Sequence, residues 1–449
     1  MTYKEAVNFV VKANDNAGEM GLEAIELLLK ELGNPEKDLT FIHVGGTNGK
    51  GSVSAYIAFI LAASGYKVGR YISPTIREYR ERIQCLEWKE TKPDISYISE
   101  HDFAIETEKL SKVYEKMKES HNRLPSAFEL ETALGFLYFR DCCCDVVMLE
   151  VGMGGKRDAT NCIPNSACTV FTSISMDHMN MLGDSLSKIA QEKAGIIKPK
   201  GSVVAYDYKS WCKERGWQDT ISTVLENYAK GQDASIHFAD FNKLSNVRHS
   251  MDGIQFDYGE YKQLATPLLG ENQVKNAALA LECVSVLEKK GWNITKEAVY
   301  EGLRKVVWEG RFQVLWKHPY YIVDGAHNED AAKSLATSIS LYLKNKKMLC
   351  IVGILADKEY DKVLGHVAPL ADKIITITPD NERALSATKC MEAAKAFCPC
   401  VEVGETVEYA MDMARQEESQ YDVVLIFGSL YYLHHVYDYI EKRKEQEKK

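Results

Sequence analysis

The sequence predicts an α/β protein with a mainly parallel sheet, divided into two domains near residues 305–310. Three observations lead to this class. Strand-like runs rich in β-branched residues alternate with helical stretches, which is the order of βαβ units. A glycine-rich turn joins the first of these strands to an apolar helix, and a second α/β series starts near Trp308. The 449 residues are enough for two large domains.

The first part of the chain predicts helices before and after a βαβ unit. Residues 1–32 have helical periodicity and end at Gly33-Asn34-Pro35, a helix stop signal. The βαβ unit is expected to consist of a strand over 39–44, a helix over 52–64 and a strand over 66–72. Residues 87–125 are charged and favour helix, with a loop near residues 92–94.

The same alternation continues to the end of the chain. In the first domain, strands are expected over 145–150, 167–174 and 202–206, and helices over 128–140, 186–194 and 276–289. The polar, weakly patterned residues 210–265 favour antiparallel strands. In the second domain, strands separated by helices are expected over 320–323, 348–352, 373–378 and 423–427. Residues 441–449 predict a solvated helix end.

The composition argues against several classes of protein. With 55 Lys+Arg and 64 Asp+Glu the net charge is −9, whereas a sequence-independent nucleic-acid binder carries a basic surface. The longest apolar stretch, residues 53–65, is shorter than the roughly 20 residues of a membrane span. The N-terminus has no signal-peptide pattern. We therefore expect a cytoplasmic protein that binds neither nucleic acid nor membrane.

The twelve cysteines do not follow a metal-binding pattern. Residues 142–144 are three adjacent cysteines, and Cys398 and Cys400 have no second pair nearby at zinc-ligand spacing. In a cytoplasmic protein we expect reduced, buried or incidental thiols.

A candidate phosphate-binding loop is the strongest local signal. It reads Gly-Gly-Thr-Asn-Gly-Lys-Gly-Ser at residues 45–52, between a strand and a helix. Backbone N–H groups of such a loop can turn onto phosphate oxygens, Lys50 adds positive charge, and the Ser52 hydroxyl could hold Mg²⁺. The match to G-x-x-x-x-G-K-[ST] is imperfect, because Val44 replaces the first glycine and Gly51 separates Lys50 from Ser52. The alternative is a glycine-rich turn with a surface lysine.

Three further residues of the first domain are candidates for the site. Glu150 ends a strand and precedes a glycine-rich loop, where a carboxylate suits Mg²⁺, although a strand-end acid facing water is the alternative. His178 follows the next strand and is either a metal ligand or a structural histidine. Lys193 lies at a helix C-terminus, where a lysine also simply complements the helix dipole.

The second domain supplies candidates for the other side of a cleft. Asp324 and His327 lie in Asp-Gly-Ala-His-Asn, directly after a strand, and Arg311 lies at the domain junction. The planar guanidinium of Arg311 could contact phosphate.

Taken in order, these motifs resemble the folylpolyglutamate synthases and dihydrofolate synthases of the Mur ligase superfamily. The resemblance extends from about Gly21 to Val436 and rests on residues 43–52, 72–74, 149–155, 158–161, 177–178, 192–199, 273–276, 308–311, 324–328, 357–358, 383–384 and 428–430. Each motif is weak by itself, but their number and order are specific.

The resemblance implies an N-terminal P-loop ATPase domain over residues 1–306 and a smaller C-terminal Rossmann-like domain over residues 307–449. It implies ATP-dependent ligation of L-glutamate to a folate through an acyl phosphate, the acceptor being a tetrahydrofolate, dihydropteroate or both. Two Mg²⁺ ions are implied as cofactors. We expect a monomer.

The resemblance also assigns roles to matching residues. The triphosphate would contact Thr47, Asn48, Gly49, Lys50, Gly51 and Ser52, and the nucleotide would also contact Asn276, Arg311 and Asp324. The two Mg²⁺ ions would be held by Ser52, Ser73, Glu150 and His178. Lys193 matches a lysine that is carboxylated by CO₂, and the catalytic residues would be Lys50, Lys193 and His327.

The chain departs from the family pattern at three places. Thr75 follows Pro74 where the family usually has His, Asn272 stands where His is frequent, and Glu309 replaces Pro. Position 75 is expected on the pterin side, so it bears on folate specificity. Two other functions stay open: a Mur-type ligase acting on another carboxylate such as a cell-wall nucleotide precursor, and an ATP-binding regulatory module that has lost ligation.

Overall fold

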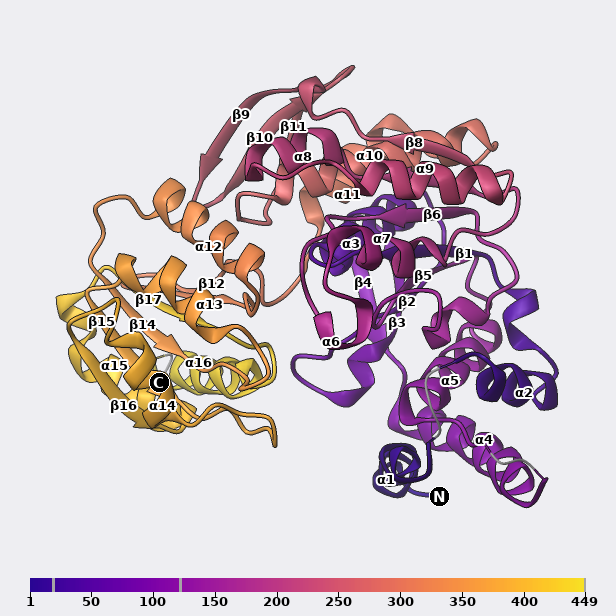
Figure 1. Ribbon diagram of the computed structural model, residues 1–449, viewed down its shortest axis with the longest axis horizontal. Coiled ribbons are helices and arrows are strands. Elements are labelled where there is room, and N and C mark those ends of the chain that lie inside the picture. Colours follow the sequence, from indigo (N-terminus) through magenta and orange to yellow (C-terminus); the bar gives the residue numbers. More distant parts are fainter. Residues whose placement is uncertain (18–20, 121–122, 448–449) are drawn as a thin grey trace.

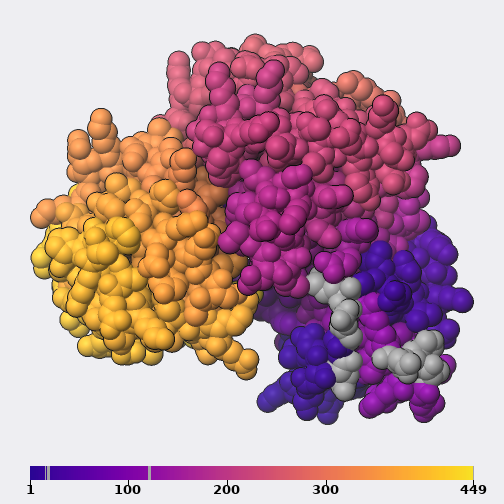
Figure 2. All heavy atoms as spheres, in the orientation of Figure 1, coloured from indigo at the N-terminus to yellow at the C-terminus, as the bar shows by residue number. Residues whose placement is uncertain are grey.

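The computed structural model describes residues 1–17, 21–120 and 123–447 (Figure 1). Within these residues it contains an eight-stranded sheet, a three-stranded sheet and a six-stranded sheet. The first two sheets belong to the N-terminal part, which runs from α1 to α11, and the third to the C-terminal part, from β12 to α16. Figure 2 shows the C-terminal part, in orange and yellow, packed as a lobe against the rest.

The eight-stranded sheet forms the scaffold of the N-terminal part. In spatial order its strands are β4 (Lys92–Tyr97), β3 (Ile83–Lys89), β2 (Val68–Tyr71), β5 (Val146–Glu150), β1 (Phe41–Gly45), β6 (Cys168–Phe171), β7 (Ser202–Ala205) and β8 (Ser235–Phe238). The neighbours in the series β2, β5, β1, β6, β7 and β8 pair in parallel, whereas the β2–β3 and β3–β4 pairs are antiparallel. Every residue of β1 and β5 is buried, as expected for parallel strands covered on both faces.

Helices cover both faces of this sheet and extend from it. Their bounds are α1 (Tyr3–Lys12), α2 (Glu23–Glu31), α3 (Lys50–Ala63), α4 (Glu100–Ser120), α5 (Ala127–Asp141), α6 (Met179–Leu182), α7 (Leu186–Ala194), α8 (Tyr208–Arg215), α9 (Ile221–Gly231), α10 (Gln273–Lys289) and α11 (Lys296–Lys305). The three-stranded antiparallel sheet of β9 (Leu244–Ser250), β10 (Gly253–Tyr258) and β11 (Tyr261–Thr266) precedes α10.

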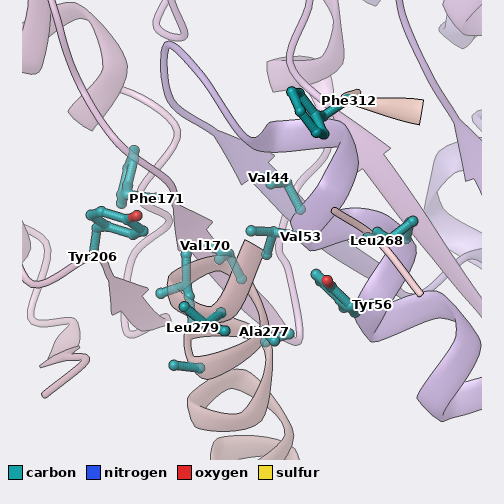
Figure 3. Packing of buried hydrophobic residues seen from close by; sticks show 14 of the residues in the cluster. Val44, Val53, Tyr56, Val170, Phe171, Tyr206, Leu268, Ala277, Leu279 and Phe312 are labelled. Atoms are coloured by element: carbon teal, nitrogen blue, oxygen red, sulfur yellow. The ribbon is translucent and has the colours of Figure 1, made fainter. Parts of the chain in front are cut away.

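Helix α3 lies at the centre of the core. All its residues from 51 to 62 are buried, and it packs against α10 and α11 as well as against the sheet. Figure 3 shows Val53 of α3 near Val44 and Val170 of the sheet, whereas Tyr56 of α3 lies on the side of Leu268 and Ala277. The phosphate-loop region at the start of α3 is therefore held by a fully enclosed helix.

The C-terminal part is built on one sheet with a single antiparallel edge. Its strands in spatial order are β12 (Gln313–Trp316), β13 (Tyr320–Asp324), β17 (Val423–Phe427), β14 (Met348–Val352), β15 (Lys373–Ile377) and β16 (Val401–Glu405). Only the β12–β13 pair in this sheet is antiparallel. The helices are α12 (Glu329–Tyr342), α13 (Tyr360–Val367), α14 (Ala387–Ala394), α15 (Val407–Glu417) and α16 (Leu433–Glu447).

The predicted α/β class with a mainly parallel sheet is confirmed, but some local predictions were wrong. Residues 92–94, expected in a loop, begin strand β4, where Pro93 is tolerated because β4 is the sheet edge. In the stretch 210–265 antiparallel strands are present only from β9 onwards, because α8 and α9 occupy its first part. Strands β12 and β16 were not foreseen. Residues 18–20, 121–122 and 448–449 of the predicted helical stretches lie outside the described residues.

None of the helices in the described residues combines the length and the apolar character that a membrane span requires.

Candidate active site

A cavity of about 650 Å³ lies where the carboxyl ends of the two parallel sheets face each other. Strands β1 and β5 end at it from one side, and β13 from the other. Every residue proposed from the sequence for the site lines this cavity: Thr47, Asn48, Gly49, Lys50, Gly51, Ser52, Ser73, Glu150, His178, Lys193, Asn276, Arg311, Asp324 and His327. The fold thus brings together side chains that are up to 280 positions apart in sequence.

The glycine-rich loop between β1 and α3 is pinned by the segment after β6. The backbone N–H of Thr47 donates to Ser173 O at 2.7 Å, and the Thr47 hydroxyl donates to Ser175 O at 3.1 Å. The Lys50 ammonium donates to the loop's own carbonyls, Gly46 O at 3.4 Å and Thr47 O at 3.2 Å. Lys50 is therefore folded back over the loop, at the N-terminus of a buried helix, which is where an anion binds favourably.

Packing against Trp308 explains why the residue that separates Lys50 from Ser52 is a glycine. A Cβ atom at position 51 would lie 2.1 Å from Cζ2 of Trp308, far inside van der Waals contact. Trp308 in turn lies over the Arg70 guanidinium, 5.2 Å from it. The chain that leads into the C-terminal part therefore rests directly on the phosphate loop, and the extra glycine makes room for it.

Glu150 is a buried carboxylate with spare hydrogen-bonding capacity. Burial raises its pKa to about 7, although the nearby cations Lys50, Arg311 and Arg70 oppose the rise. Among the described residues its Oε2 atom has no hydrogen-bond partner. A buried, orphaned carboxylate oxygen facing a cavity fits a cation ligand.

The other predicted metal ligands differ in character. Ser52 is buried and its hydroxyl accepts from Gln273 Nε2 at 3.4 Å. The His178 side chain is 39% exposed. Burial of the remainder lowers its pKa on balance, despite the opposing effect of the adjacent Asp177, so the ring is mainly neutral near pH 7. The described part of the chain holds no group of three or more His, Cys, Asp or Glu side chains arranged for a metal. Hydroxyl, water or phosphate oxygens would have to complete the coordination of any cation bound at Glu150.

Lys193, the penultimate residue of α7, is buried with its ammonium at the phosphate loop. Its Nζ donates to Gly46 O at 2.8 Å, so it shares that carbonyl with Lys50. Burial, reinforced by repulsion from Lys50, lowers the pKa of Lys193 to about 7. A large fraction of this amine is therefore neutral under physiological conditions.

The C-terminal side of the cavity is formed by the end of β13. Asp324 accepts from the backbone N–H groups of Phe312 and Ala326, both at 2.8 Å, and burial raises its pKa. Nδ1 of His327 contacts the Gly325 carbonyl at 2.8 Å, so Nδ1 carries the proton and Nε2 is an acceptor. Burial and the nearby Lys358 lower the pKa of His327 to about 4, which keeps the ring neutral.

One ion pair across the cavity was not foreseen from the sequence. The Lys358 ammonium lies 2.9 Å from Asp177 Oδ1, and both side chains are nearly buried. Burial by itself would raise the pKa of Asp177, but Lys358 and the neighbouring histidines lower it well below its usual range. Both residues lie in recognised motifs, yet a pairing across 181 positions leaves no local signal in the sequence.

Comparison with known proteins identifies the family of this chain. Residues 44–284 match the Mur ligase middle domain and residues 310–430 the Mur ligase glutamate ligase domain. A dihydrofolate synthase/folylpolyglutamate synthase of Bacillus subtilis is 31% identical over 422 residues, which cover 92% of this chain and 93% of the relative. This chain belongs to the folylpolyglutamate synthase family.

Solved structures of folylpolyglutamate synthases agree with the assignment. The Thermotoga maritima folylpolyglutamate synthase is 30% identical with a TM-score of 0.81, and the match covers 98% of this chain and 96% of the other. The Mycobacterium tuberculosis folylpolyglutamate synthase complexed with ADP and AMPPCP is 27% identical, with a TM-score of 0.83 and coverage of 98% and 99%. The family predicted from the order of motifs is confirmed.

The contact between Gly51 and Trp308 can be tested by filling and then relieving it. We expect Gly51→Ala to cost about 1–3 kcal/mol of unfolding free energy, because the methyl group overpacks a closed contact. Adding Trp308→Leu should recover much of this loss, with Trp308→Leu alone as the control. Urea denaturation measures all three variants. Wild-type stability of Gly51→Ala, or a double variant no better than the single one, would contradict the packing explanation.

Proposed function

We propose that this chain is an ATP-dependent ligase that joins L-glutamate to a folate. The observation that carries the proposal is the cavity itself: a pinned glycine-rich loop with Lys50 and the buried Glu150 faces Arg311 and Asp324 of a second α/β sheet. Membership of the folylpolyglutamate synthase family supports this function over ligation to a cell-wall nucleotide precursor.

The chemistry explains why cations and a closed cavity are needed. A carboxylate does not react with an amine because oxide is a poor leaving group, so ATP must first convert it to an acyl phosphate. Both partners of that step are anionic, and the ammonium of Lys50 and the guanidinium of Arg311 offset their repulsion. Water would hydrolyse the acyl phosphate, which favours a reaction enclosed between the two sheets.

His327 is the candidate acceptor for the proton of the attacking amine. Its pKa of about 4 makes it a neutral hydrogen-bond acceptor through Nε2 and a weak base. We infer that it orients the glutamate amine and takes the proton as the new C–N bond forms, when the nitrogen becomes much more acidic.

We propose that Ser52, Ser73, Glu150 and His178 hold two Mg²⁺ ions. Support comes from the orphaned Oε2 of Glu150 and from the neutral ring of His178, since both are ready to accept a cation. Bound Mg²⁺ would supply charge neutralisation for the transferring phosphate. The residues of this chain contribute the carboxylate, imidazole and hydroxyl groups that select its position.

We further propose that Lys193 is carboxylated by CO₂. The neutral amine nitrogen would bond to the carbon of CO₂ and release one proton to solvent, leaving an anionic carbamate. The pKa of about 7 and the proximity of Lys50 support this, because the modification replaces a cation that repels Lys50 by an anion that attracts it.

The remaining expectations belong to the same proposal. We infer a boundary between residues 306 and 307, because the chain from Trp308 onwards leads into the second sheet. A monomer remains our expectation for the oligomeric state. Cytoplasmic location is inferred from the composition.

The proposed activity predicts phosphate release that requires ATP, L-glutamate and a folate together. Tetrahydrofolate, dihydropteroate and a UDP-linked acceptor should be compared using labelled glutamate. Lys50→Ala should lower kcat about 10²–10³-fold while folding is kept, because a charge that acts on the transition state is removed. Lys188→Ala, on the exposed face of α7, is the matched control. Turnover with the UDP-linked acceptor alone, or a Lys50→Ala variant as fast as wild type, would refute the proposal.

The metal assignment predicts a change in Mg²⁺ dependence. Glu150→Gln and His178→Ala should each raise the Mg²⁺ concentration that gives the half-maximal rate, because each loses a ligand. His366→Ala, which removes a surface histidine, serves as the control. If both variants keep the wild-type Mg²⁺ curve, Glu150 and His178 do not belong to the metal site.

The carbamate predicts a dependence on CO₂ that varies with pH. Because carboxylation needs the neutral amine of Lys193, bicarbonate should reactivate CO₂-depleted protein more strongly at pH 8 than at pH 6, on either side of its pKa of about 7. A carbamate signal from ¹³C-bicarbonate should be present in wild type and absent from Lys193→Ala. That variant should be nearly inactive and partly restored by acetate. Full activity of Lys193→Ala without added anion would count against the modification.

A further inference from the structure

A buried ion pair joins the N-terminal part to helix α12. Asp330, the second residue of α12, accepts from Arg215 Nε at 2.7 Å, and the two side chains are only 6% and 5% exposed. Arg215 is the last residue of α8, so the pair connects elements 115 positions apart. An acid in the first turn of a helix is also favoured by the helix dipole.

The same carboxylate reaches the phosphate loop. Asp330 Oδ2 accepts from the Asn48 side-chain amide at 3.1 Å, while Oδ1 is used by Arg215. Both oxygens of Asp330 are therefore engaged within the protein, although the residue lines the cavity. This leaves Asp330 little capacity to bind a substrate and makes it a connection between Arg215 and Asn48.

Asn48 is also paired with the N-cap of α12. Its amide and that of Asn328 exchange hydrogen bonds, Nδ2 to Oδ1 at 3.3 Å in one direction and 3.2 Å in the other. Asn328 Oδ1 caps α12 by accepting from the Ala331 N–H at 2.9 Å, and Asn328 Nδ2 also donates to Asp177 at 3.1 Å. The N-cap residue Asn328 and the second residue of α12, Asp330, thus hold one side chain of the phosphate loop.

The position of Arg215 is determined by its own half of the molecule. Its guanidinium lies over the ring of Trp211, which is 1% exposed, and Glu214 lies 3.7 Å from its Nη1. A buried charge is strongly unfavourable without its partner. The Arg215 guanidinium is therefore held in place by the N-terminal part, and the carboxylate of Asp330 pairs with it from the C-terminal part.

We propose that Asp330 is a positioning residue, fixed by Arg215, that sets the register between Asn48 of the phosphate loop and the Asp324–His327 segment preceding α12. The proposal rests on the function proposed above, because that function requires the two sides of the cavity to act on one acyl phosphate. Because both oxygens of Asp330 accept hydrogen bonds from the protein, we assign it a role through Asn48. Its contribution is to keep the γ-phosphate side and the amine side at the distance that transfer needs.

The neighbouring acid supplies a matched control. Glu329 precedes Asp330 on α12, but it is exposed and pairs with Lys362 on α13 at 2.9 Å, within the C-terminal part. Glu329→Gln therefore removes one carboxylate charge from the same helical turn without touching the bridge to Asn48.

The first test compares the effect of each variant on kcat with its effect on KM for ATP. Asp330→Asn should lower kcat about tenfold to a hundredfold, the usual effect of losing a hydrogen-bonded buried charge, while KM for ATP changes less than threefold. The double variant Arg215→Met/Asp330→Asn removes the unpaired cation and should fold even if Asp330→Asn does not, with the same loss of kcat. Glu329→Gln should retain wild-type kcat. A double variant that folds and turns over like wild type would overturn the proposal.

The second test does not depend on turnover. Hydrogen exchange of the amides at residues 47–50 and 328–332 should accelerate about tenfold in the double variant relative to wild type and Glu329→Gln. If wild type exhibits no folate ligation but the exchange effect is present, the proposed function fails and the coupling stands. If ligation is present and the double variant exchanges like wild type, the coupling fails.

Discussion

Two ammonium groups, those of Lys50 and Lys193, donate to the same carbonyl oxygen, Gly46 O. Like charges converge in this way only where the surrounding structure leaves them no alternative. Helix α3 fixes Lys50, α7 fixes Lys193, and the segment after β6 fixes the loop that carries the carbonyl. The positive charge of Lys50, joined by that of Lys193 when its amine is protonated, therefore gathers at the glycine-rich loop, where an anion binds favourably.

Burial shifts the pKa values of ionisable groups around this pair and so reduces their charge. Glu150 has a pKa near 7 and Lys193 has a pKa near 7, each displaced toward neutrality by burial. When no ligand is bound, each group is therefore partly neutral, which lowers the free energy needed to bury it. Phosphate and cations would draw these groups back to their charged forms, which links ligand binding to proton uptake and release.

Much of the site could be read from the sequence because its residues lie at strand ends. Glu150 and Asp324 end short strands, Lys50 follows the loop after β1, and parallel sheets bring such positions to one edge. Contacts between the two halves could not be read in this way. Gly51 against Trp308, Asp177 with Lys358, and Arg215 with Asp330 each join distant segments whose spacing carries no periodicity. The same limitation explains strand β4, whose polar sequence forms an edge strand only because β3 provides a partner.

The complete burial of helix α3 also restricts the sequence changes that this protein can accept during evolution. Since every position from 51 to 62 is enclosed, the helix has no solvent face on which charged or longer side chains can accumulate harmlessly. Inserting or deleting one residue would rotate all later side chains by about 100° and misplace a whole layer of packing. Divergence in α3 is therefore confined to exchanges of similar volume.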